Sequence, residues 1–258
     1  MTSIKTYQVR GKTIGGSRPL ICAPIVAKSA AELPRAVAEI LALAPDLVEW
    51  RADYLAEIED GPAVLAALAG LREGLEAFPL IFTCRVDREG GASSIPEERR
   101  LRLIGEVIDS GKADLVDIEL CTEEGALRGL IARAKAKAVL VIVSNHDFKA
   151  TPPLAEMVER MRREQELGAD IAKIAVMPTC AGDILDLLAA TREMREEHAR
   201  IPLMTMSMSA LGVISRVSGA TFGSAITFGS GRAASAPGQI PVAELRAALD
   251  ILEGKAKA

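Results

Sequence analysis

Ala138-Val-Leu-Val-Ile-Val-Ser-Asn-His-Asp147 is an apolar run that closes on polar residues, and Asp170-Ile-Ala-Lys-Ile-Ala-Val-Met-Pro178 is a second run of the same kind. Runs that are apolar nearly throughout are typical of parallel strands covered on both faces. Between them, residues 153–168 are amphipathic and end on Gly168, a glycine of the helix C-cap type. This unit therefore predicts a strand, a helix and a parallel strand.

The same unit recurs along the whole chain. Strand starts are roughly 22 to 33 residues apart, the length of one strand and one helix. Eight such units predict an α/β fold of the (β/α)8 or TIM barrel type. A doubly wound open sheet is the alternative, but it usually has fewer strands, and no GxGxxG follows the first run. The expected strands are Leu20 to Val26, Leu47 to Tyr54, Leu80 to Val86, Ala113 to Leu120, Ala138 to His146, Asp170 to Pro178, Pro202 to Ser209 and Ser224 to Gly229.

No linker or low-complexity tract divides the sequence, so residues 1–258 are expected to form a single barrel domain. Residues 1–18 contain a hairpin pattern around Gly11, which we expect to close the bottom of the barrel. Residues 229–241 are rich in glycine and proline, as in a hinged loop, and are expected to form a lid over the active site. A glycine-rich loop here is also compatible with phosphate binding or with an ordinary connection.

Composition narrows the class of partner. The net charge of −4 gives no basic footprint, so a nucleic-acid partner is not expected. The start lacks an apolar signal region and no run approaches a membrane span, which predicts a cytoplasmic protein with no membrane partner. Four widely spaced cysteines, Cys22, Cys84, Cys121 and Cys180, form no CxxC motif and are expected to be reduced thiols in the core or at strand ends.

Polar residues recur late in the expected strands. In a (β/α)8 barrel the active site lies at the carboxyl ends of the strands, so these residues are candidates for chemistry. Any one of them alone is equally well explained as a salt bridge at the barrel mouth. The candidates are Glu49, Arg51, Asp53, Arg85, Glu89, Asp117, Glu119, Asn145, His146, Lys173, Ser207 and Ser209.

Lys173 is the strongest candidate, because it lies within an apolar strand pattern beside Ile171 and Ala175. Burial there should lower the pKa of its ammonium and favour the nucleophilic amine. The alternative is an ion pair with Asp117 or Glu119 on a neighbouring strand. An amine of this kind predicts carbonyl chemistry through a Schiff base.

His146 ends the strand before the one that carries Lys173, so the two side chains can converge over one barrel mouth. Histidine is the usual proton carrier near neutral pH. The alternative is a structural role, in which His146, after Asn145, caps the following loop or helix. His198 lies on a charged helical pattern and is expected at the surface, and one useful histidine without HxH or HExxH disfavours a metal enzyme.

An iminium at Lys173 would acidify the adjacent carbon, and His146 could take that proton and return one to a leaving hydroxyl. These two proton transfers amount to a β-elimination of water. The same start could instead break a carbon–carbon bond, as class I aldolases do. A barrel that binds a carboxylate metabolite without catalysis is a third possibility.

Arginine forms bidentate pairs with carboxylates, so Arg51, Arg85 and Arg216 predict an anionic, hydroxyl-rich substrate. Glu49 beside Arg51 suits hydroxyl recognition, or simply an ion pair. Ser235 and Gln239 are polar donors in the expected lid, and Met204, Met206 and Met208 form a stripe that suits packing as well as lining a site.

From about residue 18 to the C-terminus the chain closely resembles the type I 3-dehydroquinate dehydratases, Schiff-base enzymes of the shikimate pathway. The motifs that carry the resemblance are specific. They are Glu49-Trp-Arg-Ala-Asp53, Thr83-Cys-Arg-Val-Asp-Arg-Glu-Gly-Gly91, Ser144-Asn-His-Asp-Phe148, Lys173-Ile-Ala-Val-Met-Pro178, Met204-Thr-Met-Ser-Met-Ser209, Gly212-Val-Ile-Ser-Arg216 and Ser235-Ala-Pro-Gly-Gln239.

The resemblance implies a (β/α)8 barrel, commonly a homodimer, that uses no metal or organic cofactor. It implies syn elimination of water from 3-dehydroquinate to give 3-dehydroshikimate, the third step of chorismate and aromatic amino acid biosynthesis. Lys173 would then be the Schiff-base lysine, His146 the general acid and base, and Glu89 the carboxylate that orients the histidine. Pro24 departs from the family, since relatives can have a serine there, so a hydroxyl contact at that position is in doubt.

For the remaining positions the resemblance implies substrate binding. Arg216 would hold the substrate carboxylate, and Ser235 with Gln239 would belong to the closing loop. The ring hydroxyls would contact Glu49, Arg51 and Arg85, and Met206 and Phe228 would line the ring pocket.

Overall fold

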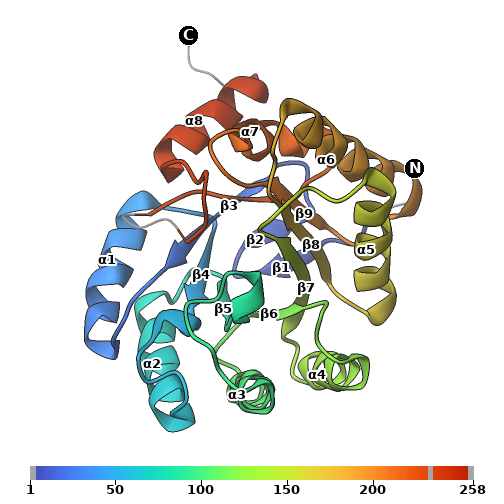
Figure 1. Cartoon of the computed structure of the whole chain (residues 1–258). Helices are drawn as coiled ribbons and strands as arrows, with labels where there is room; N and C mark the ends of the chain where they lie inside the picture. The colour runs from blue at the N-terminus through green and yellow to red at the C-terminus, as the bar shows by residue number, and fades with distance from the viewer. Residues whose placement is uncertain (1–3, 232–234, 255–258) are drawn as a thin grey trace.

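The computed structural model describes residues 4–231 and 235–254, and its centre is one sheet of eight parallel strands in the order β10-β3-β4-β5-β6-β7-β8-β9 (Figure 1). Each strand lies within one of the expected strand ranges, except that β7 extends one residue beyond His146, to Asp147. The strands are β3 Leu20–Ile25, β4 Leu47–Arg51, β5 Leu80–Thr83, β6 Leu115–Glu119, β7 Leu140–Asp147, β8 Ile171–Val176, β9 Leu203–Ser207 and β10 Ile226–Phe228.

The sheet closes on itself between its first and last strands. Leu203 and Ser224 form a parallel bridge, and the Ala225 N–H donates to the Leu203 carbonyl at 2.7 Å. The Thr205 N–H donates to Ser224 Oγ at 3.0 Å, so a side chain completes the seam. The expected TIM barrel is therefore confirmed, and the open-sheet alternative is excluded.

One helix follows each strand and the helices surround the barrel (Figure 1). Gly168 ends α5 with a φ of 101°, a left-handed conformation that glycine adopts without strain. Among the described residues, no helix is long and apolar enough to cross a membrane. The helices are α1 Leu33–Leu43, α2 Gly61–Gly74, α3 Glu97–Ser110, α4 Glu124–Ala136, α5 Leu154–Leu167, α6 Ala181–Glu193, α7 Val213–Phe222 and α8 Val242–Leu252.

Several expected strands end earlier than the apolar runs suggested. The run from Leu47 to Tyr54 forms strand only to Arg51, and Ala52–Tyr54 is a short 3-10 helix. The run from Leu80 to Val86 leaves the sheet after Thr83, so Arg85 lies just beyond β5. In both cases the backbone leaves the ladder where the side chains become charged and turn to the barrel mouth.

Apolar side chains fill two layers. The outer layer lies between the sheet and the helices and includes the edge-to-face pair Trp50 and Phe82, whose ring centroids are 5.6 Å apart. The inner layer lies inside the barrel toward the amino ends of the strands. It contains Leu47, Ile81, Leu115, Ile142 and Ile171, among others.

The N-terminal hairpin closes the amino end of the barrel, as expected. Strands β1 Tyr7–Val9 and β2 Lys12–Ile14 are antiparallel, and Arg10 and Gly11 both have positive φ at the tight turn. Ile14 is fully buried in the inner apolar layer, and the Tyr7 hydroxyl donates to Asp170 Oδ1 at 2.8 Å. Residues 1–3 of the expected hairpin segment lie outside the described residues.

All four cysteines are free thiols. Cys22 and Cys84 are buried, as expected of core residues, whereas Cys121 and Cys180 are exposed just after the strands. His198 ends a short π-helical turn, Met194–His198, after α6.

Candidate active site

The barrel interior changes from apolar to charged along each strand. Successive inward residues are two apart, because side chains alternate across a strand. Leu47 in β4 is followed by Glu49 and Arg51, and Ile171 in β8 is followed by Lys173. The strand pattern therefore places an apolar layer at the amino end and an ionic layer at the carboxyl end.

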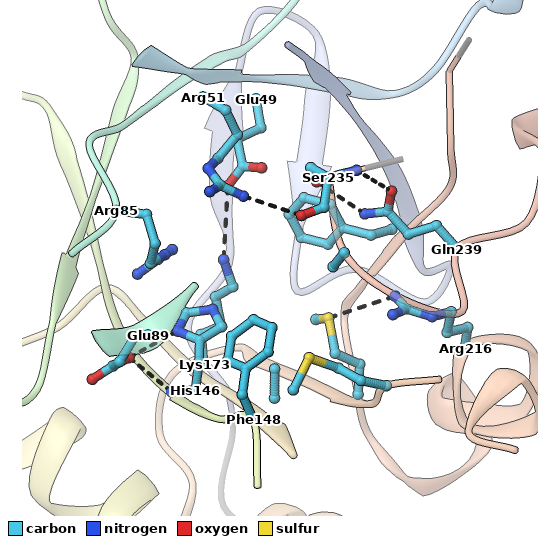
Figure 2. Close-up of a pocket in the computed structure, with 15 residues that line it drawn as sticks. Glu49, Arg51, Arg85, Glu89, His146, Phe148, Lys173, Arg216, Ser235 and Gln239 are labelled. Carbon is cyan, nitrogen blue, oxygen red and sulfur yellow. Dashed lines mark hydrogen bonds and ion pairs between the residues drawn. The ribbon is translucent and has the colours of Figure 1, made fainter. Parts of the chain in front are cut away.

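A pocket of about 430 Å³ opens above this ionic layer (Figure 2). This size suits a small ligand. The pocket is lined by all the residues for which the resemblance implied a role in catalysis or substrate binding: Lys173, His146, Glu89, Glu49, Arg51, Arg85, Arg216, Ser235, Gln239, Met206 and Phe228. Six other candidates late in the strands do not line it: Asp53, Asp117, Glu119, Asn145, Ser207 and Ser209. The lining also includes Phe148, Ala175, Met208 and Ala236, which were not among the predicted site residues.

Phe148 is the most substantial of the added residues. Its ring lies against Gly90, where a Cβ atom would be only 2.3 Å from the ring. Gly90 also has a φ of 86°, so both space and conformation require glycine there. The signal in the sequence was an aromatic residue directly after the His146-Asp147 pair, close to the end of β7.

Lys173 lies at the bottom of the pocket, and only 4% of its side chain is exposed. Its Nζ donates to Asp117 Oδ2 at 2.7 Å and lies 3.8 Å from Glu49 Oε1. The Phe228 ring centroid is 5.0 Å from the same nitrogen. The ion pair with Asp117 that the sequence left open is therefore present, and it lies inside the pocket.

Asp117 is fully buried and binds several donors at once. Besides Lys173, it accepts from the Ser144 hydroxyl at 2.6 Å and pairs with Arg85 Nη2 at 2.9 Å. Burial alone would raise the pKa of this carboxyl, but Arg85 and Lys173 lower it well below the usual range. Asp117 is therefore a carboxylate at neutral pH.

His146 lies two residues beyond Ser144 on β7, on the same inward face, and Ser144 pairs with Lys173 in the register of β7 and β8. Glu89 holds the imidazole: its Oε2 lies 3.0 Å from His146 Nδ1 and accepts the His146 backbone N–H at 2.8 Å. Burial, together with the charges of Arg85 and Lys173, lowers the pKa of His146 well below its ordinary value. Burial also raises the pKa of Glu89.

A neutral His146 with Glu89 at Nδ1 has one favoured tautomer. The Nδ1–H donates to the carboxylate, which leaves Nε2 as an unprotonated acceptor. Figure 2 shows the imidazole between Glu89 and the Lys173 side chain. A base is thus oriented toward the pocket floor.

Arg85 is buried in a network of acids beneath the pocket. Its Nη1 donates to Glu119 Oε1 and to Ser144 Oγ, both at 2.8 Å. Arg100 on α3 donates to the other oxygen of Glu119 at 2.5 Å. Burial would lower the pKa of Arg85, but Asp117 and Glu119 raise it, so it stays charged.

Arg51 is held by Asp53 through two hydrogen bonds of 2.8 and 2.7 Å, a bidentate pair. It also donates to the carbonyls of Gly90 at 3.0 Å and Ser235 at 3.3 Å. Glu49 accepts from the Thr83 hydroxyl at 2.9 Å. These side chains are fixed by the protein before any ligand binds.

Arg216 differs from the other two arginines. Its side chain is buried and has no carboxylate partner among the described residues. Nη2 donates to the Pro237 carbonyl at 3.0 Å, Nη1 lies 3.7 Å from Met206 Sδ, and Nε has no partner among the described residues. Burial lowers the pKa of Arg216 to about 10, so it is still a cation at neutral pH.

The segment Ser235 to Gln239 borders the pocket, and Ser235, Ala236 and Gln239 belong to its lining (Figure 2). The Gln239 side chain accepts the Ser235 N–H at 3.0 Å and donates to Ser235 Oγ at 3.2 Å. Gly238 has a φ of 77° and packs so closely on Ser209 that a Cβ would lie 2.0 Å from its carbonyl oxygen. Residues 232–234 of the expected lid lie outside the described residues.

Pro24 and His198 are not among the residues that line the pocket. Pro24 pairs with Glu49 in the register of β3 and β4, and it has no hydroxyl to offer there. Pro24 therefore contributes no contact to the lining of this pocket.

Eight strands that close around a pocket of buried ionisable side chains define the class, a TIM-barrel enzyme with its site at the carboxyl end of the barrel. The sequence model of the type I 3-dehydroquinases matches residues 21–256. The chain belongs to this family.

Full-length relatives agree. The 3-dehydroquinate dehydratase of Bacillus licheniformis is 48% identical over 248 residues, which cover 96% of this chain and 98% of the relative. The structure of 3-dehydroquinate dehydratase from Geobacillus kaustophilus is 43% identical, covers the whole of both chains and gives a TM-score of 0.95. The type I enzyme of Clostridium difficile, solved with covalently modified comenic acid, is 42% identical over 98% of this chain and 99% of that one, with a TM-score of 0.94.

Proposed function

We propose that Lys173 carries out the reaction of this chain, the dehydration of 3-dehydroquinate to 3-dehydroshikimate in the shikimate pathway, by forming an imine with the substrate ketone. The family decides for this hydro-lyase reaction over aldol cleavage. The observation that carries the role of Lys173 is its place on the pocket floor, buried and beside the carboxylate of Asp117. The amine adds to the ketone carbon, and loss of one water from the carbinolamine leaves an iminium.

Asp117 supports this step through charge. It lies 2.7 Å from Nζ and pairs with the ammonium in the free enzyme. Before Lys173 can attack, the ammonium must lose a proton, and the neutral His146 is the base that faces the same pocket. His146 then gives this proton to the carbinolamine hydroxyl, which leaves as water, so that Nε2 is unprotonated again. Once the iminium has formed, the positive charge is again beside Asp117, which stabilises it without rearrangement.

His146 then moves the protons of the elimination. Its free Nε2 removes the proton from C2, and the electrons pass to the iminium nitrogen to give an enamine. When the enamine electrons return, the C1 hydroxyl leaves with the proton that His146 has just taken. Because one group removes the proton and returns it, both leave from the same face, which is a syn elimination. Hydrolysis of the remaining iminium releases the enone and the free lysine.

Glu89 keeps His146 in the tautomer that this role needs. Its carboxylate accepts both the ring Nδ1–H and the backbone N–H of the histidine. It also lies where it can stabilise the imidazolium that forms during the reaction.

Arg216 is the group that we assign to the substrate carboxylate. Arg51 and Arg85 already have carboxylate partners, whereas Arg216 has none among the described residues. A buried cation of this kind binds an anion strongly because water does not screen the pair. The ring hydroxyls are assigned to Glu49, Arg51 and Arg85. Hydrogen bonds within the protein hold these side chains on the side of the pocket away from Arg216 (Figure 2).

The remaining lining residues enclose the ring. Met206 and Phe228 belong to the inner apolar cluster and supply a surface for the carbon skeleton. Ser235 and Gln239 lie in the covering segment and would exclude water once the substrate is bound.

We further propose that the chain forms a homodimer and works in the cytoplasm. Support for association comes from large apolar side chains that are exposed on or beside the adjacent helices α7 and α8, namely Leu211, Ile214, Ile251 and Leu252. Such groups are common at subunit interfaces. Light scattering at several concentrations would give twice the 27.3 kDa chain mass, and a constant monomer mass would contradict the proposal.

The test of the catalytic role is borohydride reduction in the presence of 3-dehydroquinate, followed by peptide mapping. Reduction traps the iminium as a stable secondary amine, so the mass of the adduct should appear on Lys173 alone. The exposed Lys149 and Lys28 serve as internal controls. An adduct on either of them, or none at all under turnover conditions, would overturn the assignment.

A further inference from the structure

A buried carboxyl group lies outside the pocket and has no place in the reaction described above. Glu164 is on α5, on the outer side of the barrel wall, and is completely buried. Its Oε2 accepts the backbone N–H of Lys173 at 2.9 Å. Its Oε1 has no hydrogen-bond partner among the described residues.

This environment favours the neutral acid over the carboxylate. Burial is the main effect that raises the pKa of Glu164 well above its ordinary value, and the carboxylates of Asp117 and Glu89 act in the same direction. The hydrogen bond from the Lys173 N–H and, to a smaller extent, the charge of Arg160 oppose them, and Arg160 donates its own hydrogen bonds to Asn145 and Glu156. A polar group in such a place is unfavourable unless its hydrogen bond matters.

Strand β8, which donates this hydrogen bond, is irregular just before Lys173. The Asp170 N–H donates to Val141 of β7, whereas the Ala172 N–H donates to Pro202 beside β9. In a regular strand, N–H groups two residues apart point to the same neighbour, so the alternation is broken here. The next N–H along the chain is that of Lys173, and it donates to the Glu164 side chain.

We propose that Glu164 is a positioning residue for the nucleophile: its hydrogen bond from α5 fixes the backbone of Lys173, so that Nζ stays at the reacting position on the pocket floor. Lys173 is then held at both ends, by Glu164 at the backbone and by Asp117 at the amine. This inference rests on the proposed role of Lys173. It requires the acceptor oxygen of Glu164 but not its negative charge.

Because the acceptor oxygen is required and the charge is not, two substitutions of Glu164 should have different effects on imine formation. Glu164→Gln keeps a carbonyl oxygen and the length of the side chain, so imine formation should stay within about twofold of the native rate. Glu164→Leu removes the acceptor at similar volume and frees the Lys173 backbone. A displacement of the order of 1 Å at a reacting group costs up to about a hundredfold, so imine formation should slow by about tenfold or more. The affinity for substrate should not change, because Glu164 does not line the pocket.

The experiment measures the rate of adduct formation on Lys173 by rapid mixing with 3-dehydroquinate and borohydride quenching, together with substrate affinity and thermal stability. Met157→Ala is the matched control, since Met157 is a fully buried α5 residue outside the pocket. It should lower the melting temperature and leave the imine rate unchanged. Glu164→Met is a second variant without the acceptor, for use if Glu164→Leu does not fold.

The outcomes separate cleanly. A folded Glu164→Leu or Glu164→Met enzyme that forms the imine at the native rate overturns the positioning role. A Glu164→Gln enzyme that forms the imine as slowly as these variants also overturns the positioning role. Failure of both acceptor-free variants to fold overturns it too, because Glu164 would then be needed for stability. A native enzyme that gives no adduct on Lys173 contradicts instead the proposed function itself.

Discussion

The amino end of the barrel is closed by apolar side chains and a hairpin, whereas the carboxyl end holds a layer of buried charges and an arginine that has no carboxylate partner among the described residues. Both ends use the same strands and the same alternation of side chains. At the amino end, Ile14 fills the interior and the Tyr7 hydroxyl finds Asp170. At the carboxyl end, Arg216 Nε has no hydrogen-bond partner among the described residues.

This difference between the two ends shows which polar groups stabilise the fold and which remain available to bind a ligand. A polar group that is fully paired within the protein contributes to stability, while one that is left partly unpaired is available to a ligand. Arg51 and Arg85 are intermediate, since they are held by acids and still line the pocket. Substitutions at the two ends should therefore affect different measurements.

The largest expected effect is at the nucleophile. Lys173→Met should lower kcat/KM by more than about 10⁴-fold, because it removes the covalent step and not only the 10²–10⁴-fold of positioned acid–base catalysis. The fold should persist, since Asp117 keeps Arg85 and Ser144 as partners. Steady-state kinetics and melting curves check both points, with the exposed Lys149→Met as the control.

Removal of the base should have a smaller effect. His146→Ala should lower kcat by about 10²–10⁴-fold, while the imine on Lys173 forms more slowly but can still be trapped. Mass spectrometry after borohydride reduction measures the adduct. The His198→Ala control changes a residue outside the pocket and should behave as native. Normal turnover by His146→Ala would remove the histidine from the mechanism.

The next largest effect is expected at Arg216, which has no carboxylate partner among the described residues. Arg216→Lys keeps the charge but loses the bidentate geometry, and should lower kcat/KM by about 10- to 100-fold, mostly through KM. Arg195→Lys, at a partly exposed position outside the pocket, is the control. An unchanged KM for Arg216→Lys would mean that the carboxylate binds elsewhere.

At the closed end the effect should move from kinetics to stability. Ile14→Ala should lower the free energy of unfolding by about 2–5 kcal/mol, because it opens a cavity in the inner apolar layer. The value of kcat at 25 °C should stay native. Denaturant unfolding and activity assays on one preparation test this, with Leu185→Ala, 66% exposed in the native chain, as the control. A loss of activity in folded Ile14→Ala would show that the two ends are not independent.

The smallest expected change is with pH. His146 has a lowered pKa in the folded state, so between that value and the ordinary value of about 6.5 the unfolded chain binds more protons. The free energy of unfolding should therefore fall as the pH drops below about 6.5, and part of this slope should vanish in His146→Gln. NMR titration should show a neutral His146 ring at pH 6.5 in the native protein and an ordinary titration in urea. A charged ring in the native protein at that pH would contradict the assignment.

Much of the fold could be predicted from the sequence, because period and burial are local signals. Residues Leu140 to Val143, for example, are apolar on both faces, as is typical of a strand covered on both sides. The hairpin followed from Gly11, and Lys173 and His146 followed as polar residues late in buried strands. Strand ends were less certain because ladder pairing, not composition, decides where a strand stops.

The partners of the site residues could not be predicted in the same way. Asp117 and Lys173 are 56 residues apart, and a pattern left Asp117 and Glu119 as equal alternatives. Only the register of β6, β7 and β8 shows which acid meets the amine and which meets Arg100. Glu164 was hidden for another reason, since a glutamate in an amphipathic helix usually faces solvent.

The hydrogen bond from Tyr7 to Asp170 spans 163 residues, so its two ends are made far apart in time during synthesis. The hairpin can form early from local contacts, but its docking site is complete only after β8 has left the ribosome. Until then the apolar side of the hairpin, with Ile14, has no native surface to cover. The hairpin, which is synthesised before the barrel strands, is thus among the last elements to reach its native contacts, and the barrel closes at its base only when the strand that carries Lys173 is in place.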